Sequence, residues 1–228
     1  MAECKLVLFD CDGTLMDSEN IAAEVETELM KEYGIEMDVP TFNLRFAGTS
    51  SHHVQNVMEE ESGRHFPDDH QQNLENRMNE KLWREVKTVA GAHDMLDNLD
   101  QPRAICSNAG MSKLKLELTR GELWDRFRPY IYSAKDMEEI TPKPAPDLYL
   151  HAAKEFETEP QHCVVVEDST TGVQAGVAAG MRVIGFVGGK HTHQGHADEL
   201  TEAGAETVIS RLTDIPAILE AFAQWDGF

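Results

Sequence analysis

Two carboxylates stand directly after the first apolar run of the chain. The run extends from Lys5 to Phe9, and Asp10, Asp12 and Gly13 end it. A continuous apolar run bounded by a turn predicts a strand buried on both faces. In open α/β sheets the ligand lies beyond the carboxyl ends of such strands. Two acids this close favour a cation between them or a protonated carboxyl, although Asp and Gly also occur together in turns for purely local reasons.

Polar residues also follow two later predicted strands. Ser107 and Asn108 offer a hydroxyl and backbone N–H groups that could hold phosphate oxygens. Glu167 and Asp168 form a second acidic pair, which suits Mg²⁺. Lys143 lies between these motifs, and the prolines on either side of it restrict the backbone. This lysine is therefore expected to be held in position rather than to move freely in solvent.

The chain from residue 89 onward alternates between strand and helix patterns. Strands are predicted at 103–106, 130–132, 163–166, 183–186 and 208–209, and helices at 92–99, 111–119, 146–156, 171–179 and 215–222. Such alternation predicts a doubly wound α/β core with a parallel sheet. Gly176, Ala179 and Gly180 are assigned to close packing of a helix on this sheet.

Residues 17–87 show helical periodicity and nothing that indicates a strand. A helix is predicted from Asp17 or Ser18 to a stop at Gly34, followed by a loop or short helix over 37–46. A second helix is capped within residues 49–51 and broken at Gly63, and a polar helix covers 69–86. This segment is predicted to be an all-helical insertion.

The charge of the chain limits the choice of partners. Its 228 residues include 41 acidic and 20 basic side chains, for a formal net charge of -21. This charge repels nucleic-acid phosphates and anionic membranes, so neither is expected as a partner. No apolar stretch is long enough to span a bilayer, and the expected location is the cytoplasm. A small anionic substrate would need a metal ion or local basic residues.

The four cysteines predict reduced and mostly buried thiols. They show no C-x-x-C spacing, and each lies in or beside an apolar run. Cys11 stands between two acids, which raise the pKa of a thiol. It is therefore interpreted as structural rather than nucleophilic.

Four motifs together resemble the haloacid dehalogenase-like phosphohydrolase superfamily. In order they are Asp10-x-Asp12-Gly13-Thr14-Leu15, Ser107-Asn108, Lys143-Pro144, and Glu167-Asp168-Ser169 with Gly172 and Gly176 downstream. The chain is similar to the branch with a helical cap, which includes β-phosphoglucomutases and 6-phosphogluconate phosphatases. The resemblance implies a Rossmann-like catalytic core (1–16 and 88–228) with an inserted helical cap (17–87).

The resemblance also implies roles for individual residues. Asp10 would be the nucleophile that takes the phosphoryl group, and Asp12 the general acid and base. Mg²⁺ would be bound by Asp10, the backbone carbonyl of Asp12, and Asp168, with Glu167 either a ligand or a neighbour of the ligands.

Phosphate binding is assigned to Ser107, the Asn108 backbone and Lys143, which would stabilise the charge of the transferring group. The expected substrate is a small phosphorylated metabolite, such as a sugar or sugar-acid phosphate. The expected assembly is a monomer or weak homo-oligomer.

Functions besides that of a phosphatase are also compatible with parts of this pattern. A dehalogenase would not need Asp12, but a β-phosphoglucomutase-like enzyme would fit the acidic pairs. The chain departs from those mutases at Ala22, where they have a histidine, and after Gly48, where residues 49–51 replace an expected arginine. A receiver-type signalling module also pairs acids around Mg²⁺, but the large helical insertion argues against it. The intact charged residues argue against a catalytically inactive binding protein.

Histidines form two further candidate groups. His191, His193 and His196 lie in a glycine-rich loop, but their spacing is not a usual zinc pattern, and a substrate-facing role is favoured. His52 and His53 begin a helix of the insertion, in a region expected to influence specificity when the cap closes.

Overall fold

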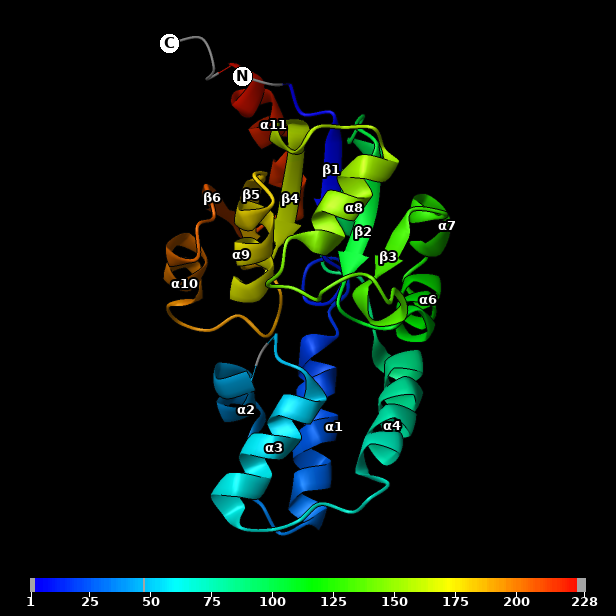
Figure 1. Cartoon of the computed structure of the whole chain (residues 1–228), viewed down its shortest axis with the longest axis vertical. Coiled ribbons are helices and arrows are strands. Elements are labelled where there is room, and N and C mark those ends of the chain that lie inside the picture. Colours follow the sequence, from blue (N-terminus) through cyan, green and yellow to red (C-terminus); the bar gives the residue numbers. More distant parts are fainter. Residues whose placement is uncertain (1–2, 47, 225–228) are drawn as a thin grey trace.

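A parallel sheet forms the centre of one half of the molecule (Figure 1). The computed structural model describes residues 3–46 and 48–224, and its strand order is β3-β2-β1-β4-β5-β6. The strands are β1 (Leu6–Phe9), β2 (Arg103–Ser107), β3 (Ile131–Ser133), β4 (Cys163–Glu167), β5 (Arg182–Phe186) and β6 (Thr207–Ile209). Central β1 pairs with β2 and β4 and is buried along its whole length. The apolar run therefore forms the buried strand that its composition predicts.

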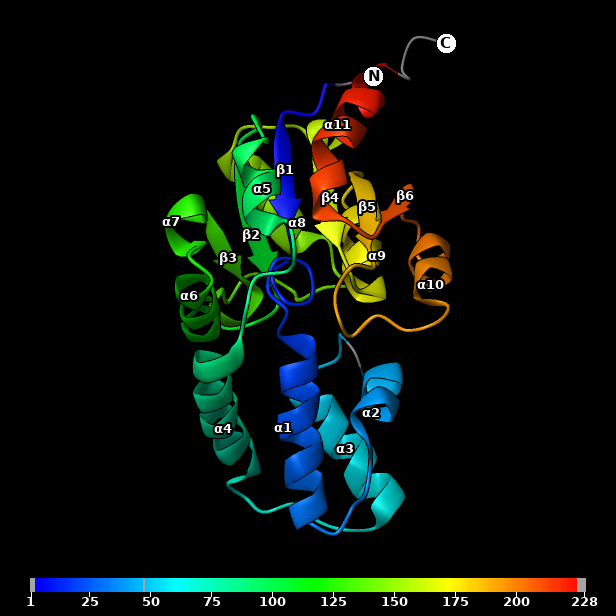
Figure 2. The ribbon, with the colours of Figure 1, turned by 180° about the vertical axis from the view of Figure 1, so that it is seen from behind.

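Helices cover both faces of the sheet. One face carries α8 (Asp147–Glu155) and α9 (Thr170–Ala178), and the opposite face carries α5 (Ala92–Asp97) and α11 (Ile215–Gln224) (Figures 1 and 2). The remaining helices of this half are α6 (Met111–Arg120), α7 (Trp124–Phe127), α10 (His196–Glu202) and the short 3-10 helices η1 (Ala134–Asp136), η2 (Pro160–His162) and η3 (Leu212–Asp214). The predicted doubly wound α/β class is confirmed.

In the part of the chain that the structure describes, four helices form the other half of the molecule, beyond the carboxyl ends of the strands (Figure 1). They are α1 (Glu19–Glu32), α2 (Val39–Phe46), α3 (Ser51–Ser62) and α4 (His70–Glu85). Ser50 caps α3 by accepting a hydrogen bond from the His53 N–H, and Gly63 ends it in a left-handed conformation. An apolar cluster that includes Met30, Phe42 and Phe66 gives α1, α2 and α3 a core of their own, and Leu74 of α4 packs against α1 in a second cluster.

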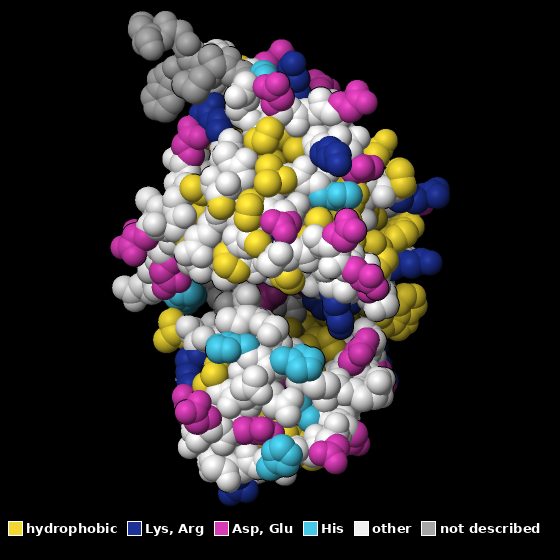
Figure 3. Space-filling model, viewed as in Figure 1, with side chains coloured by type: hydrophobic (Ala, Val, Ile, Leu, Met, Phe, Trp, Pro, Cys, Tyr) yellow, Lys and Arg dark blue, Asp and Glu magenta, His cyan; other side chains and the backbone are white. Residues whose placement is uncertain are grey.

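Two crossing segments join the halves. Met16 and Thr88 form an antiparallel bridge, and the Asp17 N–H donates to the Lys87 carbonyl at 2.9 Å. The surface is hollowed where the halves meet (Figure 3). This junction lies immediately beyond Asp12, so the insertion is attached next to the candidate site. Among the described helices, none is both long enough and apolar enough to cross a lipid bilayer.

One packing prediction was wrong. A side-chain carbon at Gly176 would lie 2.8 Å from Val183, as helix-on-sheet packing requires, but one at Gly180 would meet nothing within 4 Å. Gly180 instead has a φ of 74°, which lets the chain turn out of α9. The short helices α7 and α10 are further differences, since no pattern in the sequence predicted them.

Candidate active site

Three buried carboxylates converge at the ends of β1 and β4. Oxygen atoms of Asp10, Glu167 and Asp168 all lie within 4.8 Å of one another. Because parallel strands end at one edge of the sheet, the register of Phe9 with Val166 brings these distant residues together. The two acidic pairs predicted from sequence thus contribute to a single cluster.

Lys143 is the cation that pairs with two of these carboxylates. Its ammonium donates three hydrogen bonds of 2.7 Å, to Asp10 Oδ1, Glu167 Oε1 and the Cys106 carbonyl. Burial alone would lower the pKa of Lys143, but the two carboxylates raise it well above its ordinary value. Lys143 therefore stays protonated while buried, in the fixed position that the neighbouring prolines suggest.

Asp10 experiences opposing influences. Burial and the charges of the neighbouring acids raise the pKa of its carboxyl group well above the ordinary value, although the Lys143 ammonium opposes that rise. The contact between Lys143 and Asp10 Oδ1 favours the ionised form that a nucleophile needs.

Glu167 is enclosed by hydrogen-bond donors. Oε1 accepts from Lys143 and from the Tyr149 hydroxyl at 3.0 Å, and Oε2 accepts from the Ser169 N–H and hydroxyl, both at 3.0 Å. Gly172 is the residue against which this carboxylate packs, and any side chain there would overlap it. With every oxygen so engaged, Glu167 fits the role of a neighbour of the ligands better than that of a free ligand.

Asn108, which follows Ser107 at the end of β2, is hydrogen-bonded to the backbone of Lys143. The Asn108 side chain accepts from the Lys143 N–H at 2.9 Å and donates to the Lys143 carbonyl at 3.2 Å. The Ser107 hydroxyl is buried and accepts from the Ala109 N–H at 3.1 Å. Asn108 thus ties the end of β2 to the lysine loop, in addition to offering its backbone N–H.

Asp168 is held by two side chains. Thr14 donates to Oδ1 and His191 Nε2 lies 2.9 Å from Oδ2. Burial would lower the pKa of His191, but the hydrogen bond and the charge of Asp168 raise it. His196 contacts the Asp168 carbonyl and His193 pairs with Glu199. The rings of His193 and His196 stack, and His191 packs edge-on against His196, so the three histidines lie together beside Asp168.

Asp12 lies in a separate network that the sequence did not reveal. Its Oδ1 accepts from the Ser18 hydroxyl at 2.5 Å and from the Lys113 ammonium. Lys113 also lies 3.3 Å from the buried carboxyl group of Glu117. Burial opposes ionisation of Asp12, but Lys113 and these hydrogen bonds lower its pKa. The predicted cap residue Ser18 thus binds Asp12 instead of a backbone N–H of α1.

Cys11 belongs to the buried apolar core of the sheet. The residue is fully buried, and burial together with the Asp12 charge raises the pKa of its thiol well above the ordinary value. All four cysteines are free and buried. The structural interpretation is confirmed.

The residues present fit a hard divalent cation. Asp10 and Asp168, with Glu167 beside them, offer only carboxylate oxygens, the ligand type that Mg²⁺ prefers, and the three form a group of converging oxygen atoms among the described His, Cys, Asp and Glu residues. The Asp12 side chain points to Lys113, so its contribution to a metal would be limited to its backbone carbonyl.

Two segments of the helical half lie next to the candidate site. Gly48 lies beside the acidic loop, since a side-chain carbon there would be 3.2 Å from Ser169 Cβ. Glu19 lies in the first turn of α1. Burial and the charges of Asp12 and Asp168 raise the pKa of its carboxyl group to about 7. Several histidines lie on the outer face of this half (Figure 3), and His52 is exposed. Their influence on specificity stays a prediction.

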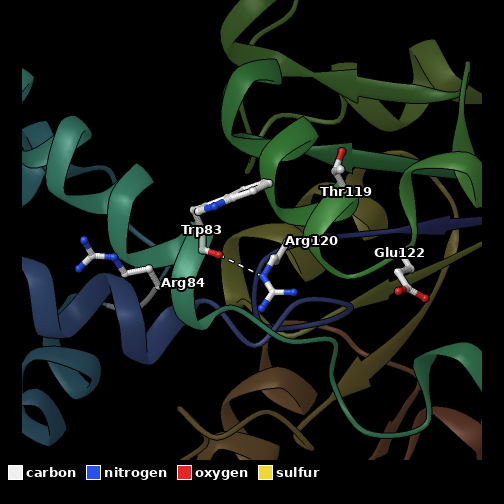
Figure 4. Close-up of a pocket in the computed structure, with 5 residues that line it drawn as sticks. All are labelled: Trp83, Arg84, Thr119, Arg120 and Glu122. Carbon is white, nitrogen blue, oxygen red and sulfur yellow. Dashed lines mark hydrogen bonds between the residues drawn. The ribbon is translucent and has the colours of Figure 1, made fainter.

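A second hollow lies between α4 and α6 (Figure 4). Its volume is about 480 Å³, and its lining residues are Trp83, Arg84, Thr119, Arg120 and Glu122. The Arg120 Nε–H donates to the Trp83 carbonyl at 3.1 Å and so links the two halves. This hollow contains none of the converging carboxylates and offers no equivalent chemistry.

Comparison with known proteins agrees with this geometry. The family model of haloacid dehalogenase-like hydrolases matches residues 7–186. The chain belongs to this family. The match includes all four motifs and the helical insertion.

Individual relatives cover nearly the same length. The 6-phosphogluconate phosphatase of Escherichia coli (strain K12) is 29% identical over 192 residues, which are 84% of this chain and 86% of the relative. A haloacid dehalogenase-like protein of unknown function from Agrobacterium tumefaciens has a TM-score of 0.90 and 44% identity, with 96% and 99% of the two chains covered. A hydrolase of the family from Deinococcus radiodurans, solved with bound phosphate and sodium, has a TM-score of 0.82 and 33% identity, with 97% and 98% covered.

Proposed function

We propose that this protein is a Mg²⁺-dependent phosphatase that hydrolyses a small phosphomonoester through an aspartyl-phosphate on Asp10. The observation that carries the proposal is the contact of the Asp10 carboxylate with the buried Lys143 ammonium. Asp10 is also one of the three acids whose oxygen atoms converge there. An anionic ester could approach this carboxylate because a fixed cation adjoins it, although the protein as a whole is acidic.

The chain's own residues would act in two steps. Asp10 attacks phosphorus, the bond to the leaving alcohol breaks, and Asp12 gives that alcohol a proton. Arrival of the phosphate dianion raises the pKa of Asp12, since like charges disfavour its ionised form. Water then attacks phosphorus, Asp12 takes its proton, and the bond to Asp10 breaks.

Charge on the transferring group would be stabilised by Lys143, the Ser107 hydroxyl and the Asn108 backbone N–H. Mg²⁺, held by Asp10, Asp168 and the Asp12 carbonyl, would neutralise phosphate charge when bound. We assign Glu167 to anchoring Lys143, because its oxygens already accept from described donors.

Residues 1–16 and 88–228 would form the catalytic core, and 17–87 a cap that excludes bulk water and selects the ester. The relative from E. coli supports a sugar or sugar-acid phosphate as substrate. A reducing compartment such as the cytoplasm suits four free, buried cysteines.

The test is phosphate release from a panel of phosphomonoesters, with Mg²⁺ and with a chelator. The panel includes sugar phosphates, sugar-acid phosphates, phosphoglycolate and β-glucose 1-phosphate. Release that requires Mg²⁺ supports the phosphatase, and the fastest ester identifies its substrate class. Conversion of β-glucose 1-phosphate to the 6-phosphate without release would establish the mutase instead.

A further inference from the structure

Lys113 occupies a position that local rules of helix formation disfavour. It is the third residue of α6, where the positive end of the helix dipole repels a cation. Its partner Glu117 follows at i+4, the less favourable order for a lysine and glutamate pair. A charged residue placed against local preference indicates a role elsewhere in the molecule.

That role is visible in the contacts of the ammonium. Lys113 reaches across 101 residues of sequence to donate to Asp12 Oδ1, the same oxygen that accepts from Ser18. Two donors on one oxygen restrict rotation of the carboxyl group. The side chains of Lys113 and Asp12 are 24% and 15% exposed, so little water competes for this contact.

Glu117 holds the lysine from the other side. Its carboxyl group is completely buried, with one oxygen 3.3 Å from the Lys113 ammonium, and burial together with the Asp12 charge raises its pKa to about 8. Burying such a group is costly unless it is paired. Its position one turn along α6 fixes Lys113 between two carboxyl groups.

We propose that Lys113, supported by Glu117, is a positioning residue that orients the Asp12 carboxyl group toward the leaving oxygen. The inference rests on the proposed phosphatase function. In the first step the ester P–O bond breaks, the bond from phosphorus to Asp10 forms, and the proton moves from Asp12 to the leaving oxygen. An alkoxide needs that proton in order to leave, whereas 4-nitrophenolate leaves without it. Loss of Lys113 should therefore affect alkyl esters selectively.

The experiment compares kcat/KM for 4-nitrophenyl phosphate, phenyl phosphate and the fastest alkyl ester of the panel. This parameter reports the steps up to transfer of the phosphoryl group. For Lys113→Met we expect kcat/KM to fall about 100-fold with the alkyl ester and less than about fivefold with 4-nitrophenyl phosphate. The fall with phenyl phosphate should lie between these two. Glu117→Gln should show the same order with smaller changes.

Lys115→Met is the matched control, because Lys115 is exposed on the same helix and contacts the Trp124 ring instead. It should leave all three values within about twofold of wild type. If Lys113→Met does not fold, the same comparison of the three esters with Glu117→Gln tests the proposal, since glutamine keeps the shape of the side chain. Equal losses for all three esters, or none, would overturn the positioning role. Failure of the wild type to cleave any ester would instead refute the proposed function.

Discussion

Replacing Lys143 by methionine should destabilise the protein chiefly through the carboxylates left behind. The substitution removes three hydrogen bonds of 2.7 Å from an ammonium whose side chain is only 3% exposed. Breaking a buried ion pair by removing one partner costs about 3–5 kcal/mol, because the remaining charge is buried without compensation. Here two carboxylates and a carbonyl lose their donor, so we expect a loss of about 4 kcal/mol in metal-free buffer.

Magnesium should reverse part of this loss. Without Lys143 the cluster of Asp10, Glu167 and Asp168 has more uncompensated negative charge, which strengthens cation binding. An ion present at 100 times its dissociation constant stabilises the folded state by about 2.7 kcal/mol. The variant should therefore gain more stability from Mg²⁺ than the wild type does, while remaining impaired in phosphate release.

The assay is urea unfolding followed by circular dichroism, with a chelator and with 10 mM Mg²⁺ as a rough working excess. Lys154→Met is the control, since Lys154 is exposed on α8 and its loss should change the unfolding free energy by less than about 0.5 kcal/mol. A loss below about 1 kcal/mol for Lys143→Met in metal-free buffer would refute the view that Lys143 neutralises this cluster.

Two other substitutions test separate features. Burial raises the pKa of Glu26 from 4.5 to about 7, so the unfolded chain ionises first and stability falls as the pH rises through that window. Glu26→Gln should thus gain up to about 3 kcal/mol relative to wild type between pH 5 and 7.5 in urea titrations, and a constant difference would contradict the shift. Gly172→Ala should displace the Glu167 carboxylate and lower both the melting temperature and kcat/KM, whereas Val177→Ala at an exposed position of α9 should do neither. Wild-type activity in Gly172→Ala would show that the close approach is unimportant.

The strands of the sheet and the polar residues at their ends could be predicted from the sequence, because both depend on local patterns. A short apolar run that ends in polar residues predicts both a buried strand and the edge at which its side chains emerge. Asp10, Ser107 and Glu167 all follow such runs, and they lie at neighbouring strand ends. Helix stops were equally local, as the left-handed glycines at 34 and 63 show.

The contacts that orient these residues could not be predicted in the same way. Lys113 meets Asp12 only because α6 packs beside the turn after β1, and Tyr149 reaches Glu167 from the sheet-facing side of α8. Helical periodicity places such residues on a face but does not say which polar atom of a distant loop they contact. The unfavourable place of a lysine in the first turn of α6 was the available clue.

Phosphate release by Asp10→Asn tests the proposed chemistry at its first step. Asparagine keeps the shape of the side chain but cannot attack phosphorus, so the folded variant should lose at least about a thousandfold in kcat with the best ester in Mg²⁺. Circular dichroism of the same sample verifies that the fold is intact. A folded variant that keeps more than a small percentage of wild-type activity would contradict the assignment of Asp10 as the nucleophile.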